Sequence, residues 1–216
     1  MQKFKNRKGP DNMLLQIHPD NPNPREMAMV IDALKNDGLI IYPTDTVYGL
    51  GWSIHSPKAF DKIVRIKGKN ALKENFSIIC SDISQVSQFT MHINNPTFKL
   101  LKKNLPGPFT FILNANSNVP KFHKTKKKTV GIRIPGNNIP IEIVNLLGHP
   151  IMTTSLHHED EILEYLTDPE LIHEKYEHLV DYVIDGGFGN NEASTIIDCT
   201  GKEPEIIRQG IGELIL

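Results

Sequence analysis

The feature of this sequence that most constrains its fold is an alternation of short apolar runs with helix-forming segments. The run Leu39–Tyr42 is apolar throughout and has the length of a buried strand. A helix signal precedes it, because Asn23 can cap a helix that starts at Pro24 and Gly38 can end that helix. The same alternation recurs along the chain, and it predicts an α/β sheet with helices packed on it.

The remaining elements are predicted by the same reasoning. Helices are expected to start at Ser56-Pro57 and to cover 83–89, 96–105, 139–147 and 168–178. Strands are expected at 76–80, 109–113, 129–134, 151–154, 182–184, 195–198 and 205–208. Residues 1–12 are polar and are predicted to be a loose N-terminal tail, so that residues 13–216 form one domain.

The charge is unevenly distributed, although the formal net charge is −1. Residues 151–216 contain fifteen acidic and three basic side chains, which leaves ten acidic and twenty-one basic ones in residues 1–150. A basic face could attract phosphate or nucleic acid. The two parts could equally dock on each other and neutralise their charges.

The cellular setting is predicted from what the sequence lacks. Cys80 and Cys199 are the two cysteines, which is too few for a disulfide framework and favours a reducing compartment. The first ten residues lack the apolar stretch of a signal peptide, and no apolar run reaches the ~18 residues of a membrane span. A cytoplasmic protein with no membrane partner is therefore expected.

The segment from Pro43 to Gly51 carries the most chemical information. It follows a buried strand and presents the hydroxyls of Thr44, Thr46 and Tyr48 and the carboxylate of Asp45 in a predicted turn. Ligands bind at strand ends of open α/β sheets, and hydroxyl and free N–H groups suit an anionic oxygen. The alternative is an ordinary turn in which side chains cap local backbone groups, and composition alone favours that alternative.

Three groups of basic residues are further candidates. Lys67 and Lys69 flank a glycine after a helix, where two ammonium groups can hold a phosphate or a carboxylate. Arg133 lies inside an apolar strand, so we expect it to point into a site or onto a buried carboxylate. The lysine-rich loop contains Lys121, Lys124, Lys126, Lys127 and Lys128. These lysines could bind nucleic acid non-specifically, or could simply be solvated.

Other patterns do not predict a site. Adjacent histidines such as His157 and His158 point apart on a strand, and no second group of ligands accompanies them, so no metal site is predicted. Nucleotide-binding loops of the Walker and dinucleotide types are absent. The glycine-rich stretch at 186–189 has the wrong spacing for such a loop and is interpreted as a flexible turn.

Taken together and in order, seven segments resemble the Sua5/YciO/YrdC family. They are 43–51 (PTDTVYGLG), 67–69 (KGK), 106–110 (PGPFT), 129–135 (TVGIRIP), 154–155 (TS), 194–198 (STIID) and 208–210 (RQG). The resemblance covers residues 39 to about 210. It implies a single-domain, twisted open mixed sheet with flanking helices, of the YrdC/RibB-like type, with a positively charged concave face.

The resemblance also implies an activity. Active members make threonylcarbamoyl-adenylate from L-threonine, bicarbonate and ATP, and the product is used in the threonylcarbamoyl modification of adenosine in tRNA. ATP would be a substrate, with Mg²⁺ accompanying it. Members have also been described as binding double-stranded RNA, so the alternative is an RNA- or ribosome-binding, translation-factor-like module with little or no catalysis.

The family's functional positions can be carried over to this sequence. The implied catalytic residues are Lys67 and Lys69; the implied substrate- and nucleotide-binding residues are Thr44, Thr46, Tyr48, Thr110, Arg133, Ser155, His157, Ser194 and Arg208. Lys124, Lys126, Lys127 and Lys128 are the candidates for RNA binding.

Two positions depart from the family pattern. Lys69 stands where the family has an arginine, and a lysine lacks the planar two-pronged donor of a guanidinium. His157 stands where the family has an asparagine, so an imidazole replaces an amide. The variant Ser155-Leu156 resembles the YciO branch. These departures keep open the RNA-binding alternative and a related enzyme that adenylates another small acid.

Overall fold

The computed structural model describes residues 13–68, 76–123, 128–156 and 167–216, so the predicted tail at 1–12 lies outside the described residues. The strands are β1 (Met13–Gln16), β2 (Leu39–Tyr42), β3 (Gly49–Ser53), β4 (Ser77–Ile79), β5 (Phe109–Asn114), β6 (Thr129–Arg133), β7 (Ile151–Ser155), β8 (Tyr182–Asp185), β9 (Thr195–Asp198) and β10 (Glu205–Arg208). The helices are α1 (Pro24–Lys35), α2 (Pro57–Lys67), α3 (Ile83–Phe89), α4 (Asn95–Asn104), α5 (Asn138–Leu147) and α6 (Pro169–Tyr176), with a short 3₁₀ turn, η2 (Lys121–His123).

Helix starts follow from the local sequence. The side chain of Asn23 accepts a hydrogen bond from the backbone N–H of Arg25, and Ser56 does the same for Ala59. Asp168 caps α6 through the N–H of Glu170. Each of these caps is followed directly by a proline, whose fixed φ angle and missing N–H suit the first helical turn. The three predicted cap-and-proline starts are therefore confirmed.

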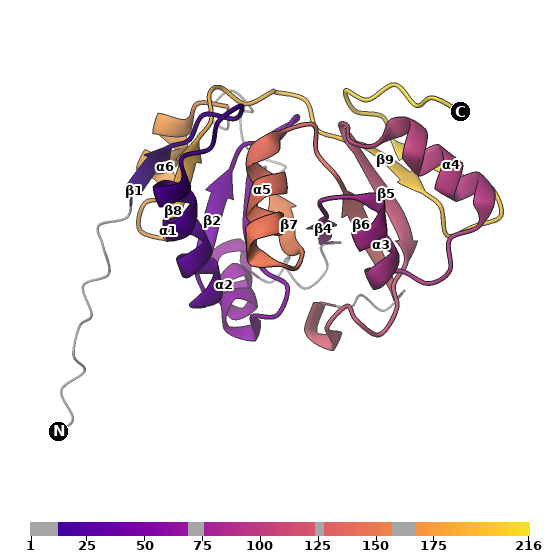
Figure 1. Cartoon of the computed structure of the whole chain (residues 1–216), viewed down its shortest axis with the longest axis horizontal. Helices are drawn as coiled ribbons and strands as arrows, with labels where there is room; N and C mark the ends of the chain where they lie inside the picture. Colours follow the sequence, from indigo (N-terminus) through magenta and orange to yellow (C-terminus); the bar gives the residue numbers. More distant parts are fainter. Residues whose placement is uncertain (1–12, 69–75, 124–127, 157–166) are drawn as a thin grey trace.

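The strands form one mixed sheet in the order β1-β8-β2-β3-β7-β4-β6-β5-β9-β10. The pairs β1–β8, β2–β8, β4–β6 and β5–β9 are parallel, and the other neighbours are antiparallel. Figure 1 shows this sheet running across the whole molecule, with β1 and α1 at one end and β9 and α4 at the other. The predicted α/β class with a mixed sheet is confirmed, whereas the positively charged concave face stays a prediction.

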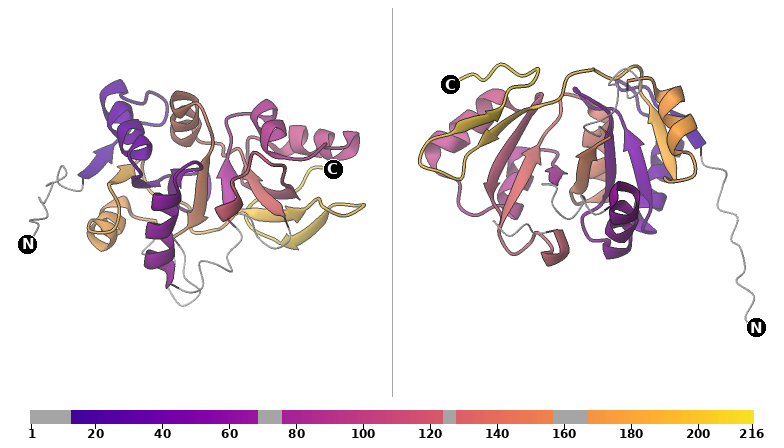
Figure 2. Two further views of the ribbon diagram at one scale, coloured as in Figure 1. Left: turned by 90° about the horizontal axis from the view of Figure 1, so that it is seen from below. Right: turned by 180° about the vertical axis from the view of Figure 1, so that it is seen from behind.

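Two apolar clusters cover the two faces of the sheet. Ile40 and Tyr42 pack with residues of α1 and α5, whereas their neighbours Leu39 and Ile41 pack with residues of α2 and α6. Alternate residues of a strand point to opposite faces, so the clusters lie on opposite sides. Figure 2 shows the corresponding helices on the two sides of the sheet.

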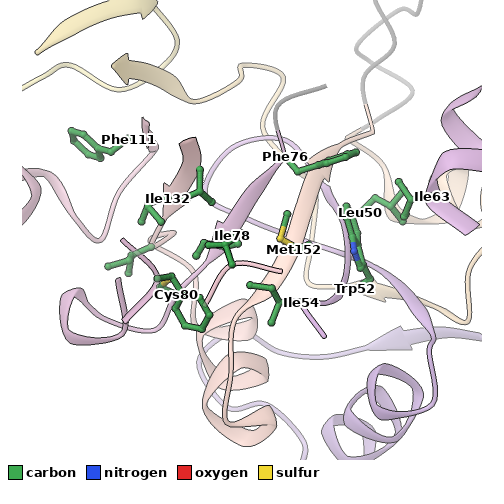
Figure 3. Packing of buried hydrophobic residues seen from close by; sticks show 14 of the residues in the cluster. Leu50, Trp52, Ile54, Ile63, Phe76, Ile78, Cys80, Phe111, Ile132 and Met152 are labelled. Atoms are coloured by element: carbon green, nitrogen blue, oxygen red, sulfur yellow. The ribbon is translucent and has the colours of Figure 1, made fainter. Parts of the chain in front are cut away.

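Aromatic rings fill the larger cluster between the sheet and α2. The ring of Trp52 meets that of Phe76 edge to face, with centroids 5.3 Å apart, and Phe60 meets Phe76 in the same way at 5.7 Å. Ile78 and Met152 occupy neighbouring positions on adjacent strands, as Figure 3 shows. Cys80 is buried in this cluster and Cys199 is partly buried beside it, and both are free thiols, as expected.

The structure corrects the sequence analysis at one element and adds another. Residues 49–51 are not a turn, because Gly49 and Gly51 lie inside strand β3, which forms a hairpin with β2. A Cβ atom on Gly51 would lie 2.7 Å from the ring of Tyr42, so glycine is required for this ring to cross the strand. Strand β1 was not predicted, and it pairs with β8 near the other end of the chain.

Within the described residues, no helix has the length and apolar character needed to cross a membrane.

The way in which the free energy of unfolding varies with pH is predicted to depend on His149. Burial, and to a lesser extent the charges of His55 and Lys35, lower the pKa of His149 below its ordinary 6.5, although a hydrogen bond to the Pro150 carbonyl opposes the shift. His149 therefore binds a proton less readily in the folded protein than in the unfolded chain. The free energy of unfolding should consequently fall as the pH drops below about 6.5. His149→Gln should reduce this pH dependence in chemical denaturation between pH 5 and pH 8.

His92→Gln, at an exposed site, is the matched control and should leave the pH dependence unchanged. If the free energy of unfolding of His149→Gln varied with pH as steeply as that of the wild type, His149 would not be the responsible group.

Candidate functional site

The loop between β2 and β3 is held in shape by its own threonines. The hydroxyl of Thr44 donates to the Val47 carbonyl at 2.8 Å and accepts from the Thr46 N–H at 3.0 Å. The two threonine hydroxyls lie 3.1 Å apart. The alternative interpretation of this segment, in which side chains cap local backbone groups, therefore applies to Thr44. This capping fixes the position from which Asp45 and Thr46 project.

Arg133, at the end of β6, reaches across to this loop. Its Nη2 atom donates to Asp45 Oδ1 at 2.9 Å and to Thr46 Oγ1 at 3.0 Å. Asp45 Oδ2 accepts from the Gly136 N–H at 2.8 Å, so both oxygens of the carboxylate are engaged. The exposed fractions of the Arg133 and Asp45 side chains are only 10% and 12%. The expectation that Arg133 points onto a largely buried carboxylate is confirmed.

The Nε group of Arg133 is a buried donor that the Asp45 and Thr46 contacts do not use. It has no hydrogen-bond partner among the described residues. A buried N–H group without a partner costs about 1–3 kcal/mol. An anionic oxygen from a ligand would satisfy this group.

A second set of hydroxyls lies on the strands beyond β6. The hydroxyls of Thr110 and Ser194 lie 2.8 Å apart, and Arg208 Nη2 donates to the Ser194 carbonyl at 2.8 Å. Partial burial lowers the pKa of Arg208 from its ordinary value, and the like charge of Arg133 lowers it further. The two guanidinium groups are therefore within electrostatic reach of each other.

Small residues keep the sheet face beside Arg133 open. Ser77, Gly131 and Thr153 are neighbours in register on β4, β6 and β7, so they share one face of the sheet. A Cβ atom on Gly131 would lie 2.3 Å from the Ser77 hydroxyl oxygen and 3.2 Å from the Thr110 methyl group. The chain therefore has no room for a side chain at Gly131, where the face is lined by hydroxyl groups.

An open pocket of about 550 Å³ borders the β2–β3 loop. It is lined by Thr44, Asp45, Thr167, Phe188, Gly189, Asn190 and Asn191. The sequence analysis interpreted 186–189 as a flexible turn and assigned it no role. The structure adds that Phe188 and Gly189 of this stretch line the pocket.

Tyr48 supports that wall from behind. It is fully buried, its hydroxyl donates to the Gly187 carbonyl at 2.6 Å, and burial raises its pKa. A Cβ atom on Gly189 would lie 2.8 Å from the Tyr48 ring, so the loop packs directly on this tyrosine. The Tyr48 hydroxyl is therefore engaged by the loop, and the role of Tyr48 in substrate binding stays a prediction.

The other predicted site residues are placed as follows. Lys67 ends α2 and is partly buried, and Ser155 ends β7 opposite Gly49 with an exposed side chain. Lys128 is exposed before β6 and has a positive φ angle of 55°. Lys69, Lys124, Lys126, Lys127 and His157 lie outside the described residues. Of the predicted set, the structure brings together Thr44, Thr46 and Arg133, and it joins Thr110, Ser194 and Arg208.

The described side chains do not fit a resident Mg²⁺ site. No group of three or more His, Cys, Asp or Glu residues in the described part of the chain could hold a metal ion. Asp45 is the carboxylate of the Arg133 cluster, and both its oxygens already accept hydrogen bonds. Mg²⁺ prefers carboxylate, phosphate and water oxygens, so it would reach this site bound to a nucleotide.

Comparison with known proteins adds an independent finding. Residues 32–210 match the protein-family model Sua5_yciO_yrdC, which is described as Telomere recombination. The chain is 40% identical over 197 residues to an uncharacterized protein of Haemophilus influenzae, covering 91% of this chain and 94% of the relative. It is 37% identical over 200 residues to the uncharacterized protein YciO of Escherichia coli, covering 92% and 95%.

Named enzymes are more distant relatives. Threonylcarbamoyl-AMP synthase of Buchnera aphidicola is 32% identical over 124 residues, which is 56% of this chain and 70% of that protein. Among solved structures, E. coli YciO superposes with a TM-score of 0.86 at 35% identity, covering 94% of this chain and 97% of that one. Sua5 of P. abyssi complexed with L-threonine has the same fold, with a TM-score of 0.83 at 24% identity, covering 92% and 58%.

The Asp45–Arg133 pair is predicted to stabilise the site and to be replaceable by an added anion. Asp45→Asn leaves a buried guanidinium without its counter-charge, so the free energy of unfolding should fall by roughly 3 kcal/mol. Phosphate at millimolar concentration should restore more stability to Asp45→Asn than it adds to the wild type, because a bound anion takes over the neutralisation. Denaturant titrations with and without phosphate measure both effects.

Asp20→Asn is the control. Asp20 lies 4.0 Å from the exposed His18, and such surface pairs contribute only about 0–1 kcal/mol. Equal losses of stability in the two variants would show that the Arg133 pair is no stronger than a surface contact.

Proposed function

The chain belongs to the Sua5/YciO/YrdC family, and on that premise we propose that it is a nucleotidyltransferase of the threonylcarbamoyl-AMP synthase type. Its substrates would be L-threonine, bicarbonate and ATP. Its product would serve tRNA modification.

The observation that supports this proposal is the proximity of two guanidinium groups, one of which is paired with a carboxylate. Arg133 is paired with Asp45, its buried Nε has no partner among the described residues, and Arg208 lies within its electrostatic reach. Two cations of this kind, next to threonine and serine hydroxyls, provide the donors that phosphate oxygens accept.

The proposed reaction makes use of these groups. The amine of L-threonine takes up the carbon of bicarbonate with loss of water, and an oxygen of the resulting carbamate forms a bond to the α-phosphorus of ATP. The bond to the bridging oxygen breaks and pyrophosphate leaves. Because one anion attacks another, catalysis requires positioning and neutralisation of charge. Arg133 and Arg208 would neutralise the phosphates, while the hydroxyls of Thr46 and Ser194 would orient them.

The relatives support the class of reaction more strongly than its details. The Buchnera relative is a threonylcarbamoyl-AMP synthase, and the P. abyssi Sua5 structure contains L-threonine. The relatives at 37–40% identity are uncharacterized. L-Threonine as the acid substrate is therefore the part of the proposal that most needs a direct test.

The test is release of pyrophosphate from ATP by the full-length protein. It should require L-threonine and bicarbonate together. Arg208→Gln should lower kcat by roughly 10²-fold, which is the usual cost of removing one donor to a charged transition state. Lys202→Gln removes a nearby exposed charge from the β9–β10 connection and should leave kcat unchanged.

Each other result has a definite meaning. Folded protein without threonine-dependent pyrophosphate release would end the proposal. Release that requires a different carboxylic acid would identify a related adenylating enzyme. RNA binding that weakens steeply with salt, in the absence of turnover, would favour the RNA-binding alternative.

Lys67→Ala is expected to weaken ATP binding more than Lys128→Ala does. Lys67 lies at the end of α2 in the segment that the family resemblance assigns to phosphate and carboxylate oxygens, whereas Lys128 is an exposed loop residue. Isothermal titration of the two variants with ATP provides the comparison. The opposite order would show that the nucleotide lies elsewhere.

A further inference from the structure

Two histidines, His55 and His149, meet at the end of β3 and β7 that is remote from the candidate site. The antiparallel register pairs Ser53 with Ile151, so continuing it by two residues places His55 directly opposite His149. The β2–β3 loop, which carries Asp45, joins the other end of β3. The sheet therefore brings the two histidines together as a cross-strand pair, away from the groups proposed to bind phosphate.

The two imidazole rings are in contact. Their centroids lie 4.6 Å apart, and their planes are inclined at 73° to each other. Two imidazoles that share one metal ion, with metal–nitrogen distances of about 2.0–2.1 Å and an angle of about 90–110° at the metal, have ring centroids roughly 4.5–5.2 Å apart. The observed separation lies within this range, so the backbone already brings the rings close enough to share an ion.

The hydrogen bond that His149 makes leaves a lone pair for a ligand. Its Nδ1 atom lies 2.9 Å from the Pro150 carbonyl oxygen, and because a carbonyl only accepts, Nδ1 is the nitrogen that carries the proton. Nε2 then has a lone pair, and it accepts no hydrogen bond from the part of the chain that the structure describes. Metal-binding histidines commonly have this arrangement, in which the other ring nitrogen donates to a backbone carbonyl and fixes the ring.

Both histidines stand on backbone that the fold holds in place. Gly148 ends α5 in the left-handed conformation, with a φ angle of 79°, and its N–H donates to the Val144 carbonyl at 3.0 Å. The His55 N–H donates to the Ser53 hydroxyl at 3.3 Å. His55 is exposed and His149 is partly buried, so an ion from solvent can reach both rings. Ligands that are held in this way lose little conformational freedom when the ion binds.

The charges around the pair limit how tightly it can bind a cation. Lys35 acts electrostatically on His149, and its positive charge opposes a second cation nearby. The carboxylate of Asp37 accepts from the Ser56 hydroxyl at 2.6 Å and pairs with Lys58 at 3.2 Å, so it is already engaged. Water would complete the coordination, as it does at open metal sites. Two protein ligands and a nearby lysine predict a site of modest affinity that exchanges its ion with solvent.

We propose that His55 and His149 form a binding site for a divalent transition-metal ion of the Zn²⁺, Ni²⁺ and Cu²⁺ class. Imidazole nitrogens suit these ions, whereas Mg²⁺ and Ca²⁺ prefer oxygen ligands. A bound ion would join the end of β3 to the start of β7 and would stabilise the folded state. The site is separate from any Mg²⁺ that enters with a nucleotide, and the inference does not depend on the proposed function.

The test is isothermal titration of the full-length protein with Ni²⁺, and with Mg²⁺ for comparison. His55→Gln removes an exposed ring, so this variant should fold as the wild type does, and it should weaken Ni²⁺ binding by at least about tenfold. His149→Gln should cause a similar loss, and the double variant should lose little more than either single variant. His92→Gln, at another exposed position, is the matched control and should leave the Ni²⁺ affinity unchanged.

The remaining outcomes each overturn the inference. Wild-type protein that binds no Ni²⁺ at millimolar concentration has no such site. If His55→Gln and His149→Gln bind Ni²⁺ as tightly as the wild type, the ion binds elsewhere. If His92→Gln loses as much affinity as His55→Gln, binding is spread over surface histidines. Mg²⁺ binding that His55→Gln abolishes would show that the pair does not select nitrogen-preferring ions. None of these results bears on release of pyrophosphate, so this inference and the proposed function fail separately.

Discussion

The organisation of this site depends on the ion pair between Arg133 and Asp45. A guanidinium group at the end of a buried strand is tolerated only when a counter-charge is available. Asp45 supplies that charge from a loop far away in the sequence and also accepts the Gly136 N–H, so the pair joins β6 and the segment after it to the β2–β3 loop. The pair leaves the buried Nε of Arg133 without a partner among the described residues, and an anionic oxygen would satisfy this donor.

The same pair divides the region into two chemically different parts. On one side lie two cations and the hydroxyls of Thr46, Thr110 and Ser194. On the other lies the pocket that Asp45 borders, which the loop at 188–191 also lines.

Local signals predicted much of the fold, and the failures have physical causes. Helix starts were predictable because a cap and a proline act within one turn, as at Asn23 and Ser56. Strand β3 was missed because glycines are poor strand formers, and its glycines are explained only by the Tyr42 ring that crosses them. Strand β1 was missed because its partner β8 is distant in the sequence. The direction of the Arg133 side chain was predictable because a charge inside an apolar strand costs free energy unless it is paired. The wall at 186–191 could be recognised only from the buried Tyr48 that fixes it.

The wall that carries Arg208 depends on the C-terminal segment. Strand β10 lies at the edge of the sheet and its apolar side chains, Ile206 and Ile207, are exposed, so their burial contributes little to its position. Thr195 accepts the Gly210 N–H and donates to the Gly212 carbonyl, and Asn104 on α4 exchanges hydrogen bonds with the backbone of Ile215. These bonds hold the segment that follows Arg208 against Thr195 and α4. They thereby set where the Arg208 side chain can reach. The wall that carries Arg208 is therefore built by the end of the chain, while the wall at 186–191 is built by the loop that Tyr48 supports.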